Sequence, residues 1–160
     1  MSIQFLDMRL SENRSDNLGT QEITMDVPLF IGDLGIQTLQ VVGTPNQSNV
    51  RVWLSGTVTV RRPSSFEGEP PTMTLWITRD GTGIPSTGTI IYTMNVTFGT
   101  NQLTILPISI TACDFPSASV VAPGQIRYSL FITSTARLGD NALILDGPVA
   151  FNGMASAGSN

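Results

Sequence analysis

The chain has 160 residues, of which 41% are hydrophobic and 12% charged, with a net charge of −4. It contains no histidine, and all eight basic residues are arginine. The lack of histidine excludes His-based triads and His-containing zinc sites, and the lack of lysine excludes Schiff-base chemistry. The acidic balance argues against a nucleic-acid partner, which requires clustered cations.

Residues 1–22 are polar and weakly patterned, so we expect an N-terminal arm there. A β-sandwich domain is expected over residues 23–155 and a small polar C-terminal tail over 156–160. The first residues lack the basic start and long apolar core of a signal peptide, so we expect synthesis in the cytosol without one. No window approaches the roughly 18 apolar residues of a membrane span, so none is expected.

After the arm the chain reads as one strand after another. Residues 22–31 are apolar but include Pro28, which predicts an edge strand or a bent one. Residues 36–43 predict a short strand that ends at Gly43, and residues 44–49 predict a turn.

Residues 49–61 carry the clearest pattern. Apolar side chains occupy every second position, at Val50, Val52, Leu54, Val58 and Val60, with Gly56 continuing the alternation. Such alternation is typical of a β-strand with one buried face.

Four further strand segments follow, each bounded by turn residues: 72–79, 89–98, 103–115 and 125–136. Residues 142–155 predict a short strand, a turn at Asp146 and Gly147, and a last strand around Val149 and Phe151. No window of about 12 residues shows a helical apolar repeat with caps. The sequence therefore predicts an all-β fold, an antiparallel β-sandwich of the jelly-roll type with about eight strands.

Four large apolar residues fall on the face of their strands that should be polar: Trp53, Trp76, Ile91 and Phe131. One interpretation is that loops cover both sheet faces, or that the expected register is shifted by one residue. The other is a subunit interface, where aromatic residues are enriched.

Cys113 is the only cysteine, so an intramolecular disulfide is excluded. It is either a small buried residue or an intermolecular cross-link. No cationic residue in "TACDFP" would activate it as a nucleophile.

The remaining acidic residues do not form a site. Asp80, Asp140 and Asp146 each lie beside a glycine or asparagine, where turn formation explains them. Glu67 and Glu69 share a proline-rich loop, which is a poor rigid base for acid–base catalysis. We expect no catalytic residue, no metal site and no cofactor.

Residues 128–157, "YSLFITSTARLGDNALILDGPVAFNGMASA", resemble the end of small β-rich proteins of the outer coat and exosporium of bacterial endospores. The likeness is clearest at residues 147–153, which fit a "GPV-x-F-x-G" strand. The resemblance implies a jelly-roll subunit that forms a resistant layer or appendage on the spore surface, with itself and other spore-surface proteins as partners. The chain has neither the collagen-like stalk nor the Cys-rich N-terminus of some of these proteins.

The leading functional hypothesis is therefore a structural, self-assembling subunit of a spore surface, which is not an enzyme. The low charge and unprotected strand edges fit self-association. A viral or phage coat or fibre protein is the first alternative. A carbohydrate-binding module, in which exposed aromatic residues stack on sugars, is the second.

Overall fold

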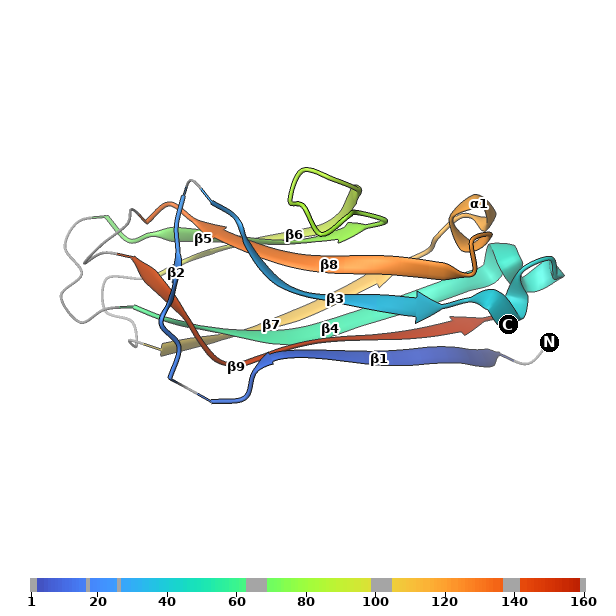
Figure 1. Ribbon diagram of the computed structural model, residues 1–160, viewed down its shortest axis with the longest axis horizontal. Helices are drawn as coiled ribbons and strands as arrows, with labels where there is room; N and C mark the ends of the chain where they lie inside the picture. The colour runs from blue at the N-terminus through green and yellow to red at the C-terminus, as the bar shows by residue number, and fades with distance from the viewer. Residues whose placement is uncertain are drawn as a thin grey trace.

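The computed structural model describes residues 3–16, 18–25, 27–62, 69–98, 105–136 and 142–158. Two antiparallel sheets pack face to face (Figure 1). The first sheet holds, in spatial order, β1 (Gln4–Arg14), β9 (Leu143–Ala157), β4 (Val50–Arg61) and β7 (Ile105–Asp114), and the short β2 (Gln21–Ile23) also pairs with β9. The second sheet holds β3 (Leu29–Gln37), β8 (Gln125–Ser134), β5 (Thr72–Arg79) and β6 (Thr89–Thr97).

The strand pairs are nested along the chain. β5 pairs with β6, β4 with β7, β3 with β8 and β1 with β9, and every pair is antiparallel. This is the pairing of a long folded ribbon that is rolled up so that successive pairs alternate between the two sheets. The predicted all-β sandwich of the jelly-roll type is confirmed.

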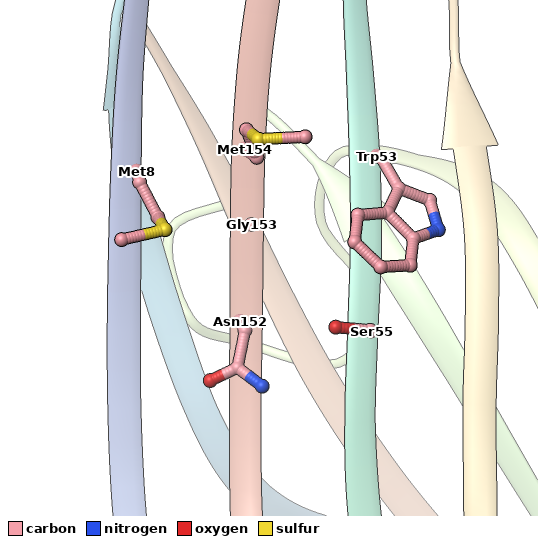
Figure 2. Close-up of a pocket in the computed structure, with 6 residues that line it drawn as sticks. All are labelled: Met8, Trp53, Ser55, Asn152, Gly153 and Met154. Atoms are coloured by element: carbon pink, nitrogen blue, oxygen red, sulfur yellow. The ribbon is translucent and has the colours of Figure 1, made fainter.

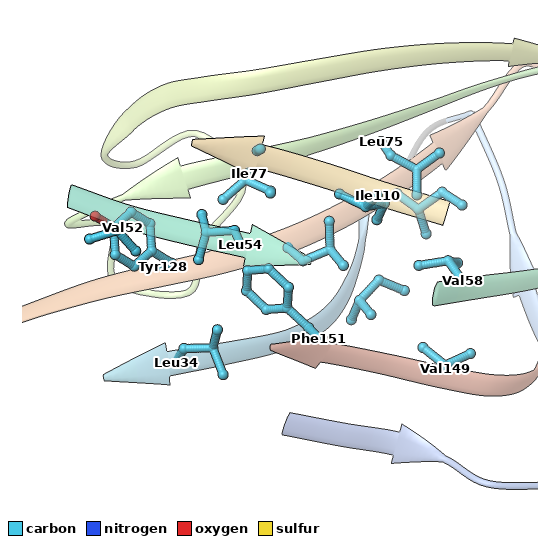
Figure 3. Packing of buried hydrophobic residues seen from close by; sticks show 14 of the residues in the cluster. Leu34, Val52, Leu54, Val58, Leu75, Ile77, Ile110, Tyr128, Val149 and Phe151 are labelled. Carbon is cyan, nitrogen blue, oxygen red and sulfur yellow. The ribbon is translucent and has the colours of Figure 1, made fainter. Parts of the chain in front are cut away.

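The core lies between the sheets and follows the alternation seen in the sequence. On β4, Val52, Leu54 and Val58 are almost completely buried, and they point toward side chains of the opposite sheet such as Leu75 (Figure 3). Gly56 is the register partner of Phe151, a fully buried ring. Burial of branched side chains at about 1.5–3 kcal/mol each is the main force that holds the two layers together.

Three short helical turns gather at one end of the sandwich: η1 (Leu39–Val41), η2 (Pro45–Asn49) and α1 (Ala118–Val121) (Figure 1). The strand predicted over residues 36–43 is therefore wrong beyond Gln37. β3 ends at Gln37, the Thr38 N–H donates to the carbonyl of Gly124, and η1 follows with Val41 buried. A short apolar run does not distinguish a strand from a helical turn.

The turn predicted at Asp146 and Gly147 is also wrong, because β9 runs without interruption from Leu143 to Ala157. The peptide bond between Gly147 and Pro148 is cis, and the pairing with β4 shifts register at this point. The Asp146 carboxylate, which would face water in a turn, is buried and accepts hydrogen bonds from two backbone N–H groups.

The segment expected as an N-terminal arm contains a strand of the sandwich itself. β1 pairs with β9 of the same chain from Gln4 to Arg14. Over these residues the chain therefore pairs with its own sheet, as the edge strand next to β9, and not with a neighbouring subunit. The domain limits at residues 22 and 155 stay predictions.

Within the described residues, no helix has both the length and the apolar character that a membrane crossing requires.

Candidate functional site: the outer face of the first sheet

The outward side of the first sheet is the candidate site, and we call it the outer face. It comprises Phe5, Met8, Leu10 and Glu12 on β1, Ser156, Met154, Asn152 and Ala150 on β9, Arg51, Trp53, Ser55 and Thr57 on β4, and Cys113, Thr111 and Ser109 on β7. On β9, β4 and β7 most of the inward neighbours of these residues lie in the core, so alternation along these strands produces the face.

One row of register partners crosses all four strands. Met8 pairs with Met154, Met154 with Trp53, and Trp53 with Cys113. Two thioethers, an indole and a thiol therefore stand side by side on the surface. We call these four residues the sulfur–aromatic row. Sulfur and aromatic rings attract one another, and thioethers adapt their shape to whatever packs on them.

The row is open to solvent. Met8 is 69% exposed, Trp53 47% and Met154 39%, and Cys113 is exposed as well. Phe5 and Leu10, the nearest apolar neighbours on β1, are also exposed. Large contiguous apolar patches are unusual on soluble monomers and mark interaction sites.

A shallow hollow of about 240 Å³ lies beside the indole (Figure 2). Its lining residues are Met8 from β1, Asn152, Gly153 and Met154 from β9, and Trp53 and Ser55 from β4. The hollow is centred over β9, where the small Gly153 sits between the two outward side chains Asn152 and Met154 (Figure 2). The indole thus stands on one strand and the hollow on the adjacent strand.

The outer face carries little charge. Among the outward-facing residues of the described strands between the row of Arg51 and the row of Thr57, the charged side chains are Arg51 and Glu12. They lie at opposite ends of the face and on different strands. Two copies of such a face can approach each other without strong repulsion.

Asp7 holds β1, and with it Met8, against the second sheet. Its carboxylate accepts hydrogen bonds from the N–H groups of Gln37 on β3 at 2.8 Å and of Met8 at 2.9 Å, and from Arg9 at 2.9 Å. Burial alone would raise the pKa of Asp7, but these hydrogen bonds outweigh it and lower the pKa below the ordinary value of 3.8.

The structure divides the four residues of the predicted interface. Trp53 lies on the outer face, whereas Trp76 and Phe131 lie on the far side of the molecule, on the outward side of the second sheet. There they stack with ring centroids 5.5 Å apart, and Phe30 meets Phe131 edge-on at 5.6 Å. Phe131 has no exposed surface and Trp76 has 9%, so coverage within the chain accounts for both.

Ile91 lies at a register shift, which is one of the two explanations that the sequence left open for its position. The pairing of β5 with β6 skips this residue, because Ile77 pairs with Tyr92 and Thr78 with Ile90. The bulge turns Ile91 toward the core, against which it packs, and Ile90 becomes the exposed residue. A single bulge thus exchanges the faces of two adjacent isoleucines.

Cys113 is exposed at the β7 edge of the outer face. The expectation of a buried small residue is therefore wrong. Its role as an intermolecular cross-link stays a prediction.

The acidic turn residues have separate roles. The buried carboxylate of Asp146 forms an ion pair at 3.1 Å with Arg61, whose side chain is 38% exposed. Asp80 adopts φ 58°, which fits its place in a turn. Asp140 and Glu67 lie outside the described residues. Among the described residues, no three His, Cys, Asp or Glu side chains come together as a metal site would require.

A larger cleft of about 470 Å³ lies at the second sheet, and charged side chains take part in its lining. Asp33 and Arg127, two of its residues, pair with each other at 2.8 Å. Their charges are thus already compensated within the chain, which makes this cleft the weaker candidate.

Sequence reasoning did not identify Met8, Leu10 and Met154 as part of the site. These three residues lie on strands that are distant in the chain. The pairing of β9 with both β1 and β4 brings them next to one another and to Trp53. Met8 and Leu10 alternate with polar residues, and that alternation was the available signal.

A scan against models of protein families finds no match, and a search of curated proteins finds none either. Among solved structures, the chain is similar to the VP2 protein of infectious bursal disease virus in T=1 particles, with 10% identity, a TM-score of 0.51, and coverage of 94% of this chain and 35% of that one. A VP2 subviral particle of the same virus gives 11% identity, a TM-score of 0.48 and coverage of 94% and 32%. The chain spans about a third of the length of these viral chains.

A third structure is a sugar-binding protein, the EclA C-terminal domain, with 13% identity, a TM-score of 0.31, and coverage of 88% of this chain and 76% of that one. At these identities the likeness to solved structures is one of fold.

Proposed function

We propose that the chain is a structural subunit that self-assembles into the coat of a particle. The observation that carries the proposal is the sulfur–aromatic row, a solvent-exposed apolar band on a face of low charge. A sheet that is apolar on both faces is unfavourable in a lone sandwich, because its outer face is in contact with water. Association with another subunit would remove this apolar surface from water.

The fold supports a coat of the viral kind. The VP2 structure with the TM-score of 0.51 is that of T=1 particles, so a longer chain that contains a fold of related shape forms particles there. The chain has 15 serines and 19 threonines and only 12% charged residues, and a surface with little charge suits close packing of many copies.

The spore surface is the other location that we propose for such a coat. Its support is the sequence resemblance at residues 147–153, which form the middle of β9. β9 pairs with both β1 and β4, so this segment builds the centre of the outer face. Both locations require the same self-assembly, and they differ in the organism and compartment where the coat is found.

Carbohydrate binding is the second candidate function. Trp53 is exposed, and Ser55 and Asn152 supply polar groups beside it in the hollow. An aromatic ring next to hydrogen-bonding side chains is the arrangement that stacks on a sugar. The hollow is shallow and mostly apolar, which favours self-association.

The test is the size and shape of the purified protein over a wide concentration range, by light scattering and negative-stain electron microscopy. We expect oligomers, shells or sheets for the wild type. Trp53→Ala should raise the concentration at which they form by about tenfold or more, since interface aromatic residues carry much of the binding energy. Ile90→Ala, which removes an exposed apolar side chain from the second sheet, is the matched control and should have little effect.

A monodisperse monomer at high concentration would contradict the proposal. If that monomer bound glycans, and lost the binding on Trp53→Ala, the carbohydrate-binding function would replace it.

A further inference from the structure

The outer face has a knob and a hole on adjacent strands. Trp53 stands on β4 with nearly half of its surface exposed, and the hollow lies over β9, between Met154 and Asn152 (Figure 2). β4 and β9 are direct neighbours in the sheet, and Trp53 is the register partner of Met154. A protruding side chain next to a hollow on the same surface suits a two-fold interface, because the protruding side chain of each copy can then fill the hollow of the other copy.

We infer that a second copy of this chain packs on the outer face about a two-fold axis that runs parallel to the strands, between β4 and β9. This inference rests on the proposed function and names its partner and geometry. Such an axis places β4 of one copy over β9 of the other. Each Trp53 then enters the hollow of the partner subunit and contacts Met154 of the partner subunit.

The rest of the sulfur–aromatic row fits the same axis. β1 lies over β7 of the other copy, so Met8 meets Cys113 of the partner subunit. The sulfur–aromatic row is therefore self-complementary about this axis. A thioether lies opposite the indole, and the other thioether lies opposite the thiol. The contact between Trp53 and Met154 of the partner subunit is a sulfur–aromatic contact, which is favourable.

The charges on the face are also compatible with this axis. Arg51 is in the row of Ser156, and Glu12 is in the row of Ala150, which continues through Thr57 to Ser109. The axis puts Arg51 opposite Ser156 of the partner subunit, and Glu12 opposite Ser109 of the partner subunit. Both charges meet hydroxyl groups, and no like charges are brought together.

The area is sufficient for a specific contact. Four strands about 4.8 Å apart cover about 19 Å, and ten residues of strand cover about 33 Å. The face therefore offers about 600 Å² per copy, or about 1,200 Å² for the pair, which is the lower limit of specific protein interfaces.

The same two faces could also pack in a second orientation, and the experiment must distinguish the two. An axis perpendicular to the strands, through the same row, would keep each strand over its own counterpart. Trp53 would then face Trp53 of the partner subunit, the hollows would stay empty, and Cys113 would face Cys113 of the partner subunit. The two orientations therefore predict different cysteine pairs.

Chemical cross-linking distinguishes them. Stacked sheets lie about 10 Å apart, which exceeds the reach of a disulfide, so a bis-maleimide with a spacer of about that length is the reagent. Within one chain, β1 and β7 are three strand spacings apart, about 14 Å, so such a linker does not join them internally. We expect no cross-linked dimer for the wild type and efficient dimer formation for Met8→Cys, which pairs with the native Cys113.

A second variant keeps the whole row intact except the thiol. Glu12→Cys/Ser109→Cys in a Cys113→Ser background places a reactive pair in a different row, and it should also give cross-linked dimers. Adding Asn152→Glu, which puts a charge in the hollow, should reduce cross-linking about tenfold or more. Thr93→Glu on β6, an exposed position of the second sheet, is the matched control and should leave it unchanged.

The outcomes separate this inference from the proposed function. Cross-linking of the wild type through Cys113 alone would overturn the orientation. No cross-linking in either cysteine variant, while light scattering still shows association, would overturn the outer face as the contact and leave self-assembly standing. A monomer at every concentration would overturn both.

Discussion

The guanidinium of Arg79 on β5 donates hydrogen bonds to the carboxylate of Asp114 on β7, with Nη1 2.8 Å from Oδ1 and 2.9 Å from Oδ2. The two strands belong to different sheets, so this pair joins the layers of the sandwich. The Tyr128 hydroxyl donates to the same carboxylate at 2.8 Å. Both partners of the ion pair are largely buried, with 17% and 9% of their side chains exposed.

Asp114→Asn should destabilise the fold strongly. The substitution keeps the shape of the side chain but leaves the Arg79 guanidinium without its counter-charge, and breaking a buried pair in this way costs about 3–5 kcal/mol. Urea unfolding measures the loss. Asp33→Asn is the control, because Asp33 and Arg127 are each about 40% exposed and such pairs contribute at most about 1 kcal/mol. Equal losses in the two variants would contradict the assigned role of Asp114.

Alkaline pH should unfold the protein through Tyr128. Burial and the Asp114 carboxylate raise the pKa of Tyr128 far above its ordinary value of 10.0. The resulting stability is complete below pH 10 and falls above it, because the unfolded chain releases the proton there and the folded chain does not. The loss is about 1.4 kcal/mol for each pH unit.

The measurement is the free energy of unfolding of the wild type and of Tyr128→Phe between pH 8 and 11.5. The variant should be less stable at pH 8, by about 1 kcal/mol for the lost hydrogen bond. It should show a shallower decline above pH 10. Parallel curves would rule out Tyr128 as the group responsible.

Acid should loosen β1 through Asp7. The pKa of Asp7 is lowered in the folded chain, so its contribution is complete above its ordinary value of 3.8 and is lost as the pH falls through the lower folded value. Protonation weakens the hydrogen bond from Gln37, which ties β1 to β3. Hydrogen exchange at pH 7 should therefore show faster exchange over residues 4–14 in Asp7→Asn than in the wild type. Unchanged exchange there would show that the pairing with β9 alone holds the strand.

Asp146→Ala should release the chain that precedes β2. The carboxylate accepts hydrogen bonds from the N–H of Gly19 at 3.2 Å and from Nε of Arg61 at 3.1 Å, and Nη2 of Arg61 donates to the carbonyl of Gly19. Loss of these hydrogen bonds to a buried acceptor should cost about 1–3 kcal/mol. Limited proteolysis should cut near residue 19 before any other described segment. Asp33→Ala, at a part-exposed pair with Arg127 on the second sheet, is the control and should leave this pattern unchanged.

The sequence predicted the strands best where alternation was strict and unbroken. The pattern over residues 49–61 matches β4, and Val52, Leu54 and Val58 are buried as it requires. Alternation is a local property of the chain, so it needs no knowledge of the partner strands. The same logic failed at Ile91, because a bulge depends on the pairing of two strands and leaves no local mark.

The candidate site could be predicted only in part. Trp53 breaks the polar pattern of its strand face in the sequence, and it is exposed. For Cys113 the sequence left burial and cross-linking open, and the residue is exposed. Phe131 was expected on the same grounds but is covered by the chain's own side chains, which include Trp76 and Phe30. Met8 and Met154 are distant in sequence, and their meeting depends on the strand order. Exposure and adjacency are properties of the tertiary fold, so composition and periodicity do not reveal them.

The central place of β9 has a consequence for the timing of assembly. β9 lies between β1 and β4 and also pairs with β2, yet residues 143–157 are synthesised after all of its partners. Until these residues leave the ribosome, β1 has no partner strand in the first sheet and β4 has an open edge. The hollow beside Trp53 does not exist on the nascent chain, because β9 supplies Asn152, Gly153 and Met154. Subunits on one polysome are therefore unable to associate through this face until each has been synthesised as far as β9.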